Sequence, residues 1–194
     1  MKRLIVLPVA AVLCFSCGAG SSNSVSISAT DVVPKIEQDV LCYTTTNSTN
    51  STQVPTVPPA VDYTFTLKAA DFNSEFGNID ETLLFQGCSV SVEPLPGTPS
   101  LAADPTVLND IVTYTYCSSD DIPPGGSATA SVTFDQYLVQ EMNGLWKQLQ
   151  QPLSYRLTVT YNYQGANSDL KASKSVTFAV TFDNFIFNAG DACQ

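Results

Sequence analysis

The sequence predicts an all-β protein, an antiparallel β-sandwich with one short helix at about residues 135–150. Three observations predict this fold class. Thr, Val, Tyr and Phe are frequent, and these residue types favour strands. Segments in which apolar and polar residues alternate recur along the chain, separated by turn-forming segments. A single segment shows the spacing of three and four residues that is typical of an amphipathic helix.

The clearest strand signals lie near the C-terminus. In residues 155–163 the odd positions are apolar or aromatic and the even positions are polar. Residues 175–182 also alternate, with Val, Phe, Val and Phe at the even positions. The segment between them, residues 164–173, is polar. Two long alternating segments around a polar loop predict a β-hairpin.

Shorter alternating segments predict the other strands, at residues 25–30, 36–43, 63–68, 84–92, 112–116 and 128–134. Gly87, inside one of them, indicates a β-bulge or a close backbone approach. Seven or eight strands of this kind resemble immunoglobulin and fibronectin-type sandwiches in pattern only, because the Cys–Trp–Cys spacing of true immunoglobulin domains is absent. A lipocalin-type barrel is the alternative, although unequal strands and a helix between two of them favour the sandwich.

The helix prediction depends on five apolar residues with helical spacing. We expect Asp135 to cap the start of this helix and Pro152 to prevent its continuation. Gly144 lowers the helix propensity of the segment. The apolar stripe comprises Leu138, Met142, Leu145, Trp146 and Leu149.

Residues 1–17 have the layout of a secretory signal. Lys2 and Arg3 precede an uncharged apolar run over residues 4–15, which is shorter than the roughly 20 residues of a membrane-spanning helix. Ser16 directly before Cys17 resembles the cleavage box of bacterial lipoproteins. The resemblance implies that Cys17 becomes the lipidated first residue of the mature protein.

The residue after the cysteine sets the destination in that family. Gly18 is not the aspartate that retains lipoproteins in the inner membrane, so the resemblance implies an outer-membrane or cell-surface lipoprotein. The alternative is an ordinary signal peptide cut near residues 18–20, which would give a periplasmic or secreted protein. In the lipoprotein reading residues 18–24 form a flexible tether, and residues 25–194 form a single β-sandwich domain.

The charge of the mature chain excludes one class of partner. Loss of Lys2 and Arg3 with the leader leaves six basic and 18 acidic residues, a net charge of −12. Phosphates of nucleic acids would repel such a chain, so no nucleic-acid partner is expected. The expected partners are the membrane, through the lipid anchor, and an envelope or surface protein or glycan.

The cysteines also indicate export. Cys42, Cys88, Cys117 and Cys193 remain after the leader, an even number without a CxxC pair. Two disulfides are expected in an oxidising compartment, and three connectivities are possible. We favour Cys42–Cys193, which would join the start of the domain to its tail, together with Cys88–Cys117. A zinc site would need all four thiols to converge.

Catalytic and metal sites are not expected. The chain has no histidine, which excludes Ser–His–Asp and Cys–His sites. Two carboxylate pairs, Asp80–Glu81 and Asp120–Asp121, could support a hydrolase, but both lie beside turn formers and are read as solvated loop charges. Weak calcium binding by residues 118–121, or by Asp71, Glu75 and Asp80, is the alternative use of these acids. No cofactor is expected.

The aromatic residues give the remaining candidate site. Five tyrosines could form a sugar-stacking platform, but each lies in the apolar phase of its strand and is assigned to the core. For Trp146, the single tryptophan, there are two hypotheses: it packs the helix onto the sandwich, or it contacts a ligand. The five tyrosines are Tyr114, Tyr116, Tyr155, Tyr161 and Tyr163.

These observations together predict an exported, lipid-anchored β-sandwich of the cell envelope that acts as a structural or interaction module without catalysis. Residues 44–59, 93–107 and 164–173 are expected to be loops and natural contact points, because rigid sandwiches present function on loops. One alternative is an extracytoplasmic module that binds a glycan or small ligand near Trp146. The second is a secreted hydrolase that uses carboxylates alone.

Overall fold

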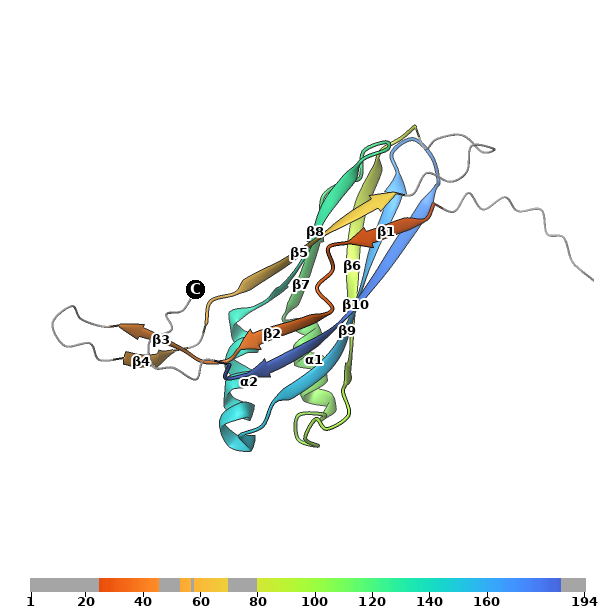
Figure 1. Cartoon of the computed structure of the whole chain (residues 1–194). Helices are drawn as coiled ribbons and strands as arrows, with labels where there is room; N and C mark the ends of the chain where they lie inside the picture. Colours follow the sequence, from red (N-terminus) through yellow and green to blue (C-terminus); the bar gives the residue numbers. More distant parts are fainter. Residues whose placement is uncertain (1–24, 46–52, 57, 70–79, 186–194) are drawn as a thin grey trace, which may run out of the picture.

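The computed structural model describes residues 25–45, 53–56, 58–69 and 80–185, with only the backbone described at residues 42–45, 53–56 and 61. In these residues two four-stranded sheets face each other (Figure 1). The first sheet has the order β1 (Ile27–Thr30), β5 (Val61–Ala69), β8 (Ser127–Phe134) and β7 (Thr115–Ser119). The second has the order β2 (Lys35–Asp39), β10 (Lys171–Asp183), β9 (Leu153–Gly165) and β6 (Leu83–Pro94).

This strand order is that of an immunoglobulin-type sandwich. The first sheet corresponds to strands A, B, E and D, and β10, β9 and β6 correspond to G, F and C. The N-terminal segment changes sheets, because β1 pairs antiparallel with β5 whereas β2 pairs parallel with β10. The predicted all-β sandwich is therefore confirmed. The barrel alternative is wrong, since the described strands of the sandwich form two separate four-stranded sheets with no ladder between them; an isolated bridge joins Leu83 only to Ile122, in the connection between β7 and β8.

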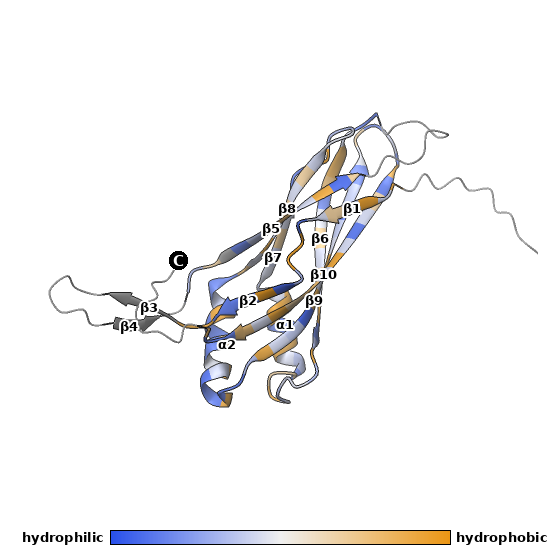
Figure 2. Cartoon of the chain, viewed as in Figure 1, coloured by the Kyte–Doolittle hydropathy of each residue, from blue (hydrophilic) through white to orange (hydrophobic). Residues whose placement is uncertain are grey.

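The predicted hairpin is the longest pairing in the described chain. β9 and β10 align antiparallel from Gln164 opposite Lys171 to Leu153 opposite Phe182. The residues of β9 at odd positions point into the core and those at even positions point outward, as the alternation requires. Along the sandwich, the ribbon accordingly changes between hydrophobic and hydrophilic colours (Figure 2).

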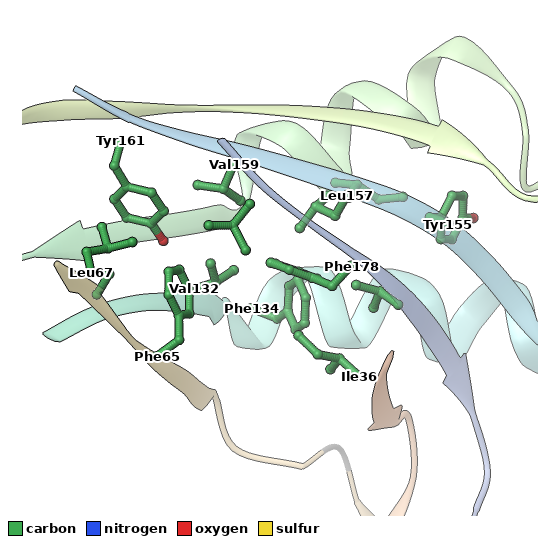
Figure 3. Packing of buried hydrophobic residues seen from close by; sticks show 14 of the residues in the cluster. Ile36, Phe65, Leu67, Val132, Phe134, Tyr155, Leu157, Val159, Tyr161 and Phe178 are labelled. Carbon is green, nitrogen blue, oxygen red and sulfur yellow. The ribbon is translucent and has the colours of Figure 1, made fainter. Parts of the chain in front are cut away.

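Aromatic side chains fill the space between the sheets. Phe65 meets Tyr161 edge to face, with ring centroids 5.6 Å apart, and Phe134 meets Phe182 at 5.5 Å (Figure 3). Such tilted contacts stabilise more than the burial of area alone. The buried tyrosines keep their hydroxyls paired, since Tyr155 donates to the carbonyl oxygen of Ala102 at 2.9 Å.

The helix α2 (Gln136–Leu149) forms where the sequence predicts it. The carboxylate of Asp135 accepts a hydrogen bond from the backbone N–H of Tyr137 and caps the first turn. Gln150 ends the helix in the left-handed conformation, with φ 51°. Of the predicted apolar stripe, Leu138 and Met142 are fully buried, and the other three residues are partly buried against the core.

A second helix, α1 (Pro105–Thr113), occupies residues that were assigned to a loop and to a strand. The prediction of one helix and of a strand from residue 112 is therefore wrong. Asp104 accepts a hydrogen bond from the N–H of Thr106, and Pro105 occupies the first turn, where its missing N–H is not needed. Because the helix ends at Thr113, β7 begins at Thr115 and its inward phase moves by one residue. Thr115 is buried, and Tyr116 points outward.

Two more assignments change near the N-terminus. The predicted strand over residues 36–43 is split into β2 and β3 (Cys42–Thr45), with the buried residues Val40 and Leu41 between them. Part of the predicted loop at residues 44–59 forms β4 (Gln53–Thr56), which pairs antiparallel with β3. This hairpin projects from the sandwich in Figure 1. The hairpin is rich in threonine, and its two backbones pair although neither strand shows the alternation of apolar and polar residues that predicts a strand.

Candidate functional site

Three tyrosines lie where α1 ends, on β7 and where α2 begins. Tyr116 on β7 is 53% exposed, and Tyr137 in the first turn of α2 is 67% exposed. Tyr114, which ends α1, packs its ring against that of Tyr137 with centroids 6.3 Å apart. We call these three residues the tyrosine surface.

Backbone contacts hold this surface in place. The N–H of Asp135 donates to the carbonyl oxygen of Tyr114 at 2.9 Å, so the start of α2 is tied to the end of α1. Thr133 of β8 lies opposite Tyr116, and on its other side it lies opposite Asp62 of β5. The Thr133 hydroxyl donates to a carboxylate oxygen of Asp62. Tyr116, Thr133 and Asp62 thus form one cross-strand row on the outer face of the first sheet.

This surface corrects the assignment of the tyrosines to the core. Tyr155, Tyr161 and Tyr163 are buried as predicted, whereas Tyr114 is half-buried and Tyr116 is exposed. The physical reason is the helix α1, which changes the phase of the following strand. Tyr137 was missed altogether, although its place two residues after a capping aspartate puts it in the exposed first turn of a helix.

Trp146, the predicted ligand contact, anchors α2 to the sandwich. Its indole N–H donates to Oδ1 of Asp183 at 2.6 Å, at the end of β10. The same oxygen accepts the N–H of Asn184 at 2.8 Å. The indole is partly buried against the core, so its N–H group is already used within the protein. Contact of the ring with a ligand remains a prediction.

The neighbouring strand ends also carry a buried amide. Gln38 is 2% exposed and accepts a hydrogen bond from the Tyr63 hydroxyl at 3.0 Å. Burial, with a smaller effect of the Asp39 carboxylate, raises the pKa of Tyr63 to about 12. Asp39 in turn accepts the N–H of Phe185 at 2.8 Å. These contacts join the ends of β2, β5 and β10.

One acid of each predicted pair, Glu81 and Asp121, has structural partners. Glu81 accepts hydrogen bonds from the Ser168 hydroxyl and, at 2.7 Å, from the N–H of Asn167 in the loop that joins β9 and β10. These hydrogen bonds lower the pKa of the Glu81 carboxyl. Asp121 accepts the N–H of Phe85 at 2.7 Å, beside the bulge at Gly87.

The described acids do not form a metal site. Among the side chains that the structure describes, no three His, Cys, Asp or Glu residues converge in a way that could hold a metal ion. Asp71 and Glu75 lie outside the described residues. A small apolar recess lies under the crossover from β1 to β2. It is lined by Val32, Val33, Ile36, Tyr63, Thr64, Phe65, Val132 and Phe178.

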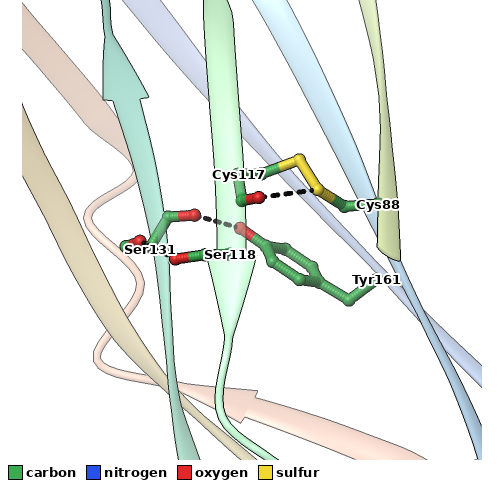
Figure 4. Close-up of a disulfide and its surroundings, with 5 residues drawn as sticks. All are labelled: Cys88, Cys117, Ser118, Ser131 and Tyr161. Carbon is green, nitrogen blue, oxygen red and sulfur yellow. Dashed lines mark hydrogen bonds between the residues drawn. A yellow bond between two sulfur atoms is a disulfide. The ribbon is translucent and has the colours of Figure 1, made fainter. Parts of the chain in front are cut away.

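One disulfide joins the edges of the two sheets. Cys88 of β6 and Cys117 of β7 are bonded, with Cα atoms 6.2 Å apart, which confirms this predicted pair. Figure 4 shows it beside Tyr161, whose hydroxyl donates to the carbonyl oxygen of Ser131 at 2.8 Å. The Cys88 sulfur also lies 3.0 Å from the carbonyl oxygen of Cys117, a close contact because an oxidised sulfur has no hydrogen to donate.

The other cysteine predictions concern parts that the structure leaves undescribed. Cys17, the tether at residues 18–24 and Cys193 lie outside the described residues, and only the backbone of Cys42 is described. The lipid anchor and the Cys42–Cys193 disulfide therefore remain predictions. In the described part of the chain, neither helix has the length and apolar character needed to cross a membrane.

The fold and the disulfide define a disulfide-linked β-sandwich of immunoglobulin type. No protein-family model matches the chain. No curated protein matches it either. Among solved structures, it is similar to AggA, the major subunit of aggregative adherence fimbriae type I from Escherichia coli, at 14% identity and a TM-score of 0.31, covering 82% of this chain and 93% of that one. A similarity of this size does not indicate what the chain does.

Proposed function

We propose that this protein is an exported β-sandwich, anchored by lipid at Cys17 in the cell envelope, and that it serves as a structural or interaction module without catalysis. The observation that supports export is the Cys88–Cys117 disulfide, because such bonds persist in oxidising compartments and are rare in the cytosol. The signal-like residues 1–17 agree with it. The lipid-anchored destination is the outer membrane or the cell surface.

The positions of the acidic side chains support a role without catalysis. A glycosidase needs two carboxyl groups that flank the scissile bond. Glu81 and Asp121 instead accept backbone N–H groups and hold loops in place. The rigid sandwich presents its loops and its tyrosine surface outward, which is the arrangement expected of a module that binds other molecules.

Intact mass tests the anchor and the disulfides together. The protein is extracted from its native host's membranes and its mass is measured before and after reduction. We expect a chain that begins at Cys17 and carries acyl groups. Its mass should rise by four hydrogen atoms on reduction, two for each disulfide. A chain that begins after Gly18 without lipid would contradict the anchor, and no gain on reduction would contradict the disulfides.

Fractionation of two cysteine variants makes the anchor test specific. Cys17→Ser should move the protein from the membrane to the soluble fraction, because the acceptor of the acyl chains is lost. Cys14→Ser is the matched control, because it changes the same residue type in the same leader and should leave the protein on the membrane. Equal fractionation of both variants would reject Cys17 as the anchor.

A further inference from the structure

The tyrosine surface is not explained by folding. Large apolar side chains stabilise a protein when they leave water, yet more than half of the Tyr116 and Tyr137 side chains remains exposed. Both rings project from rigid elements that the core, the Asp135 cap and the Asp135–Tyr114 hydrogen bond hold in place. Tyrosines that are exposed and fixed in this way are typical of binding surfaces, because they lose little conformational freedom on contact.

Each exposed ring has a carboxylate on the same outer face. Asp62 lies in the same cross-strand row as Tyr116, two strands away and separated from it by Thr133. At about 4.8 Å per strand, the row places them roughly 10 Å apart. Glu141 follows Tyr137 by four residues on α2, so the two exposed side chains are neighbours on one helix face. Thr133 donates to Asp62 and orients its carboxylate toward the row.

The nearest lysines on the same strand and helix are far from the rings. Lys68 lies six residues beyond Asp62 on β5, or roughly 20 Å at 3.3 Å per residue. Lys147 lies ten residues beyond Tyr137 on α2, or roughly 15 Å at 1.5 Å per residue, and six residues beyond Glu141, or roughly 9 Å. The ion pairs among the described residues are Lys35–Glu37 and Arg156–Glu93, so neither Asp62 nor Glu141 is paired with a basic side chain there, and the whole chain carries a formal net charge of −10.

Charge complementarity selects the occupant. A guanidinium or ammonium group is attracted both by the face of a tyrosine ring and by a carboxylate beside it. An acidic segment would be repelled by Asp62, Glu141 and the net charge of the chain. A purely apolar segment would leave both carboxylates without a partner. Arginine suits the surface best, because its planar group can stack on a tyrosine ring and its charge is attracted by the carboxylates on the same face.

We propose that the tyrosine surface binds an arginine-bearing extended segment of a partner protein, with its guanidinium groups on Tyr116 and Tyr137 and their charge met by Asp62 and Glu141. This inference rests on the proposed function and names the kind of partner that the interaction module takes. It differs from the three loops that the sequence suggests as contact points.

The test uses the full protein extracted from its host's membranes in a neutral detergent. The probe is a fluorescent peptide in which arginine and serine alternate, and binding is followed by anisotropy at two salt concentrations. A second peptide carries citrulline in place of each arginine, which keeps the shape of the side chain and removes its charge. We expect the arginine peptide to bind more tightly at low salt and the citrulline peptide to bind at least 5-fold more weakly.

Variants separate a specific surface from general attraction to an acidic protein. Tyr116→Ala and Tyr137→Ala should each weaken binding about 2- to 5-fold, the range expected for an exposed cation–π contact. Tyr116→Phe keeps the ring face and should bind like the wild type. Asp62→Asn should weaken binding, whereas Asp169→Asn, the same change in the β9–β10 loop, should not.

Three results would overturn the proposal. Binding that both Tyr→Ala variants leave unchanged would show non-specific attraction by net charge. Equal binding of the citrulline peptide would remove the need for a cation. Binding of a neutral oligosaccharide such as cellopentaose that is lost in the tyrosine variants, with no effect of those variants on the arginine peptide, would make this a sugar surface. None of these results depends on Cys17, so failure of the anchor is detected separately by fractionation.

Discussion

Gly87 and Gly144 differ in backbone conformation, because one lies at a β-bulge and the other inside a helix. Gly87 lies at the bulge of β6 with φ +127°, a conformation that side-chain-bearing residues rarely adopt. Gly144 lies inside α2, where an added Cβ would meet no atom within 4 Å. One substitution, Gly→Ala, therefore tests both positions.

We expect Gly87→Ala to lower the free energy of unfolding by about 1–3 kcal/mol, because alanine is strained at this φ although space is open. Gly144→Ala should raise it by about 0.5–1 kcal/mol, because alanine is the better helix former. Urea unfolding of both variants checks the prediction. Effects of the same sign at the two sites would contradict it.

Glu81 links the pH dependence of stability to one loop. Its pKa is lowered in the folded protein, chiefly by the Ser168 hydroxyl and then by the Asn167 N–H. A carboxyl with a lowered folded pKa stabilises above its unfolded pKa of about 4.3, and this contribution is lost as the pH falls through the lower folded value.

Glu81→Gln should therefore lower the melting temperature at pH 7, and the difference from wild type should shrink toward pH 3. Thermal unfolding of both proteins across that range measures it, and Asp80→Asn is the control for loss of one neighbouring charge. A difference that stays constant with pH would show that Glu81 does not act through its ionised form.

At the scale of the elements, α2 is held to the sandwich by Trp146 as well as by its apolar face. Trp146→Phe keeps an aromatic ring but removes the N–H that donates to Asp183. We expect a loss of about 1.5–3 kcal/mol, the range for hydrogen bonds to charged groups. Urea unfolding followed by circular dichroism measures it. Asp183→Asn, which keeps an acceptor, should cost less; a neutral effect of Trp146→Phe would leave the ring free for the ligand role.

The sequence predicted elements best where one face is buried over many residues. The hairpin of β9 and β10 and the helix α2 show long periodic patterns and lie where expected. α1 was missed although Val107, Leu108 and Ile111 have helical spacing, because it is only nine residues long and its start, Asp104 followed by Pro105, lies in a proline-rich segment. β4 was missed, and β3 was predicted only in part, as the end of the strand at residues 36–43, because backbone pairing in a projecting hairpin needs no alternation of side chains.

For the whole molecule, the Cys88–Cys117 disulfide closes one side of the sandwich. It joins residues 29 apart in the chain, and in the chain-entropy model a loop of this length contributes about 3–4 kcal/mol. Replacing both cysteines with serine should lower the free energy of unfolding by about that amount, measured by urea unfolding. The matched control is wild-type protein before and after reduction. A cost below about 1 kcal/mol would show that the core alone closes this side.

The tyrosine core predicts alkaline behaviour. Burial raises the pKa of Tyr155, Tyr161 and Tyr163, and that of Tyr63 to about 12. Folding thus favours the neutral phenols. This contribution is complete below the unfolded pKa of about 10 and is lost as the pH rises above it.

Absorbance at 295 nm should accordingly show these four tyrosines ionising only above pH 10, together with unfolding. Tyr63→Phe should reduce the absorbance change at high pH by the contribution of one tyrosine. All eight tyrosines ionising near pH 10 in folded protein would contradict the buried core.

The sequence by itself determined the fold class, the long hairpin, the helix α2, the absence of histidine chemistry and the expectation of export. These follow from composition and from local periodicity, which a single chain segment carries within itself. Only the tertiary structure decided which tyrosines face water. Tyr116 faces outward because α1 shifts the phase of β7, and Tyr137 meets Tyr114 because the start of α2, which follows β8, is hydrogen-bonded to the end of α1.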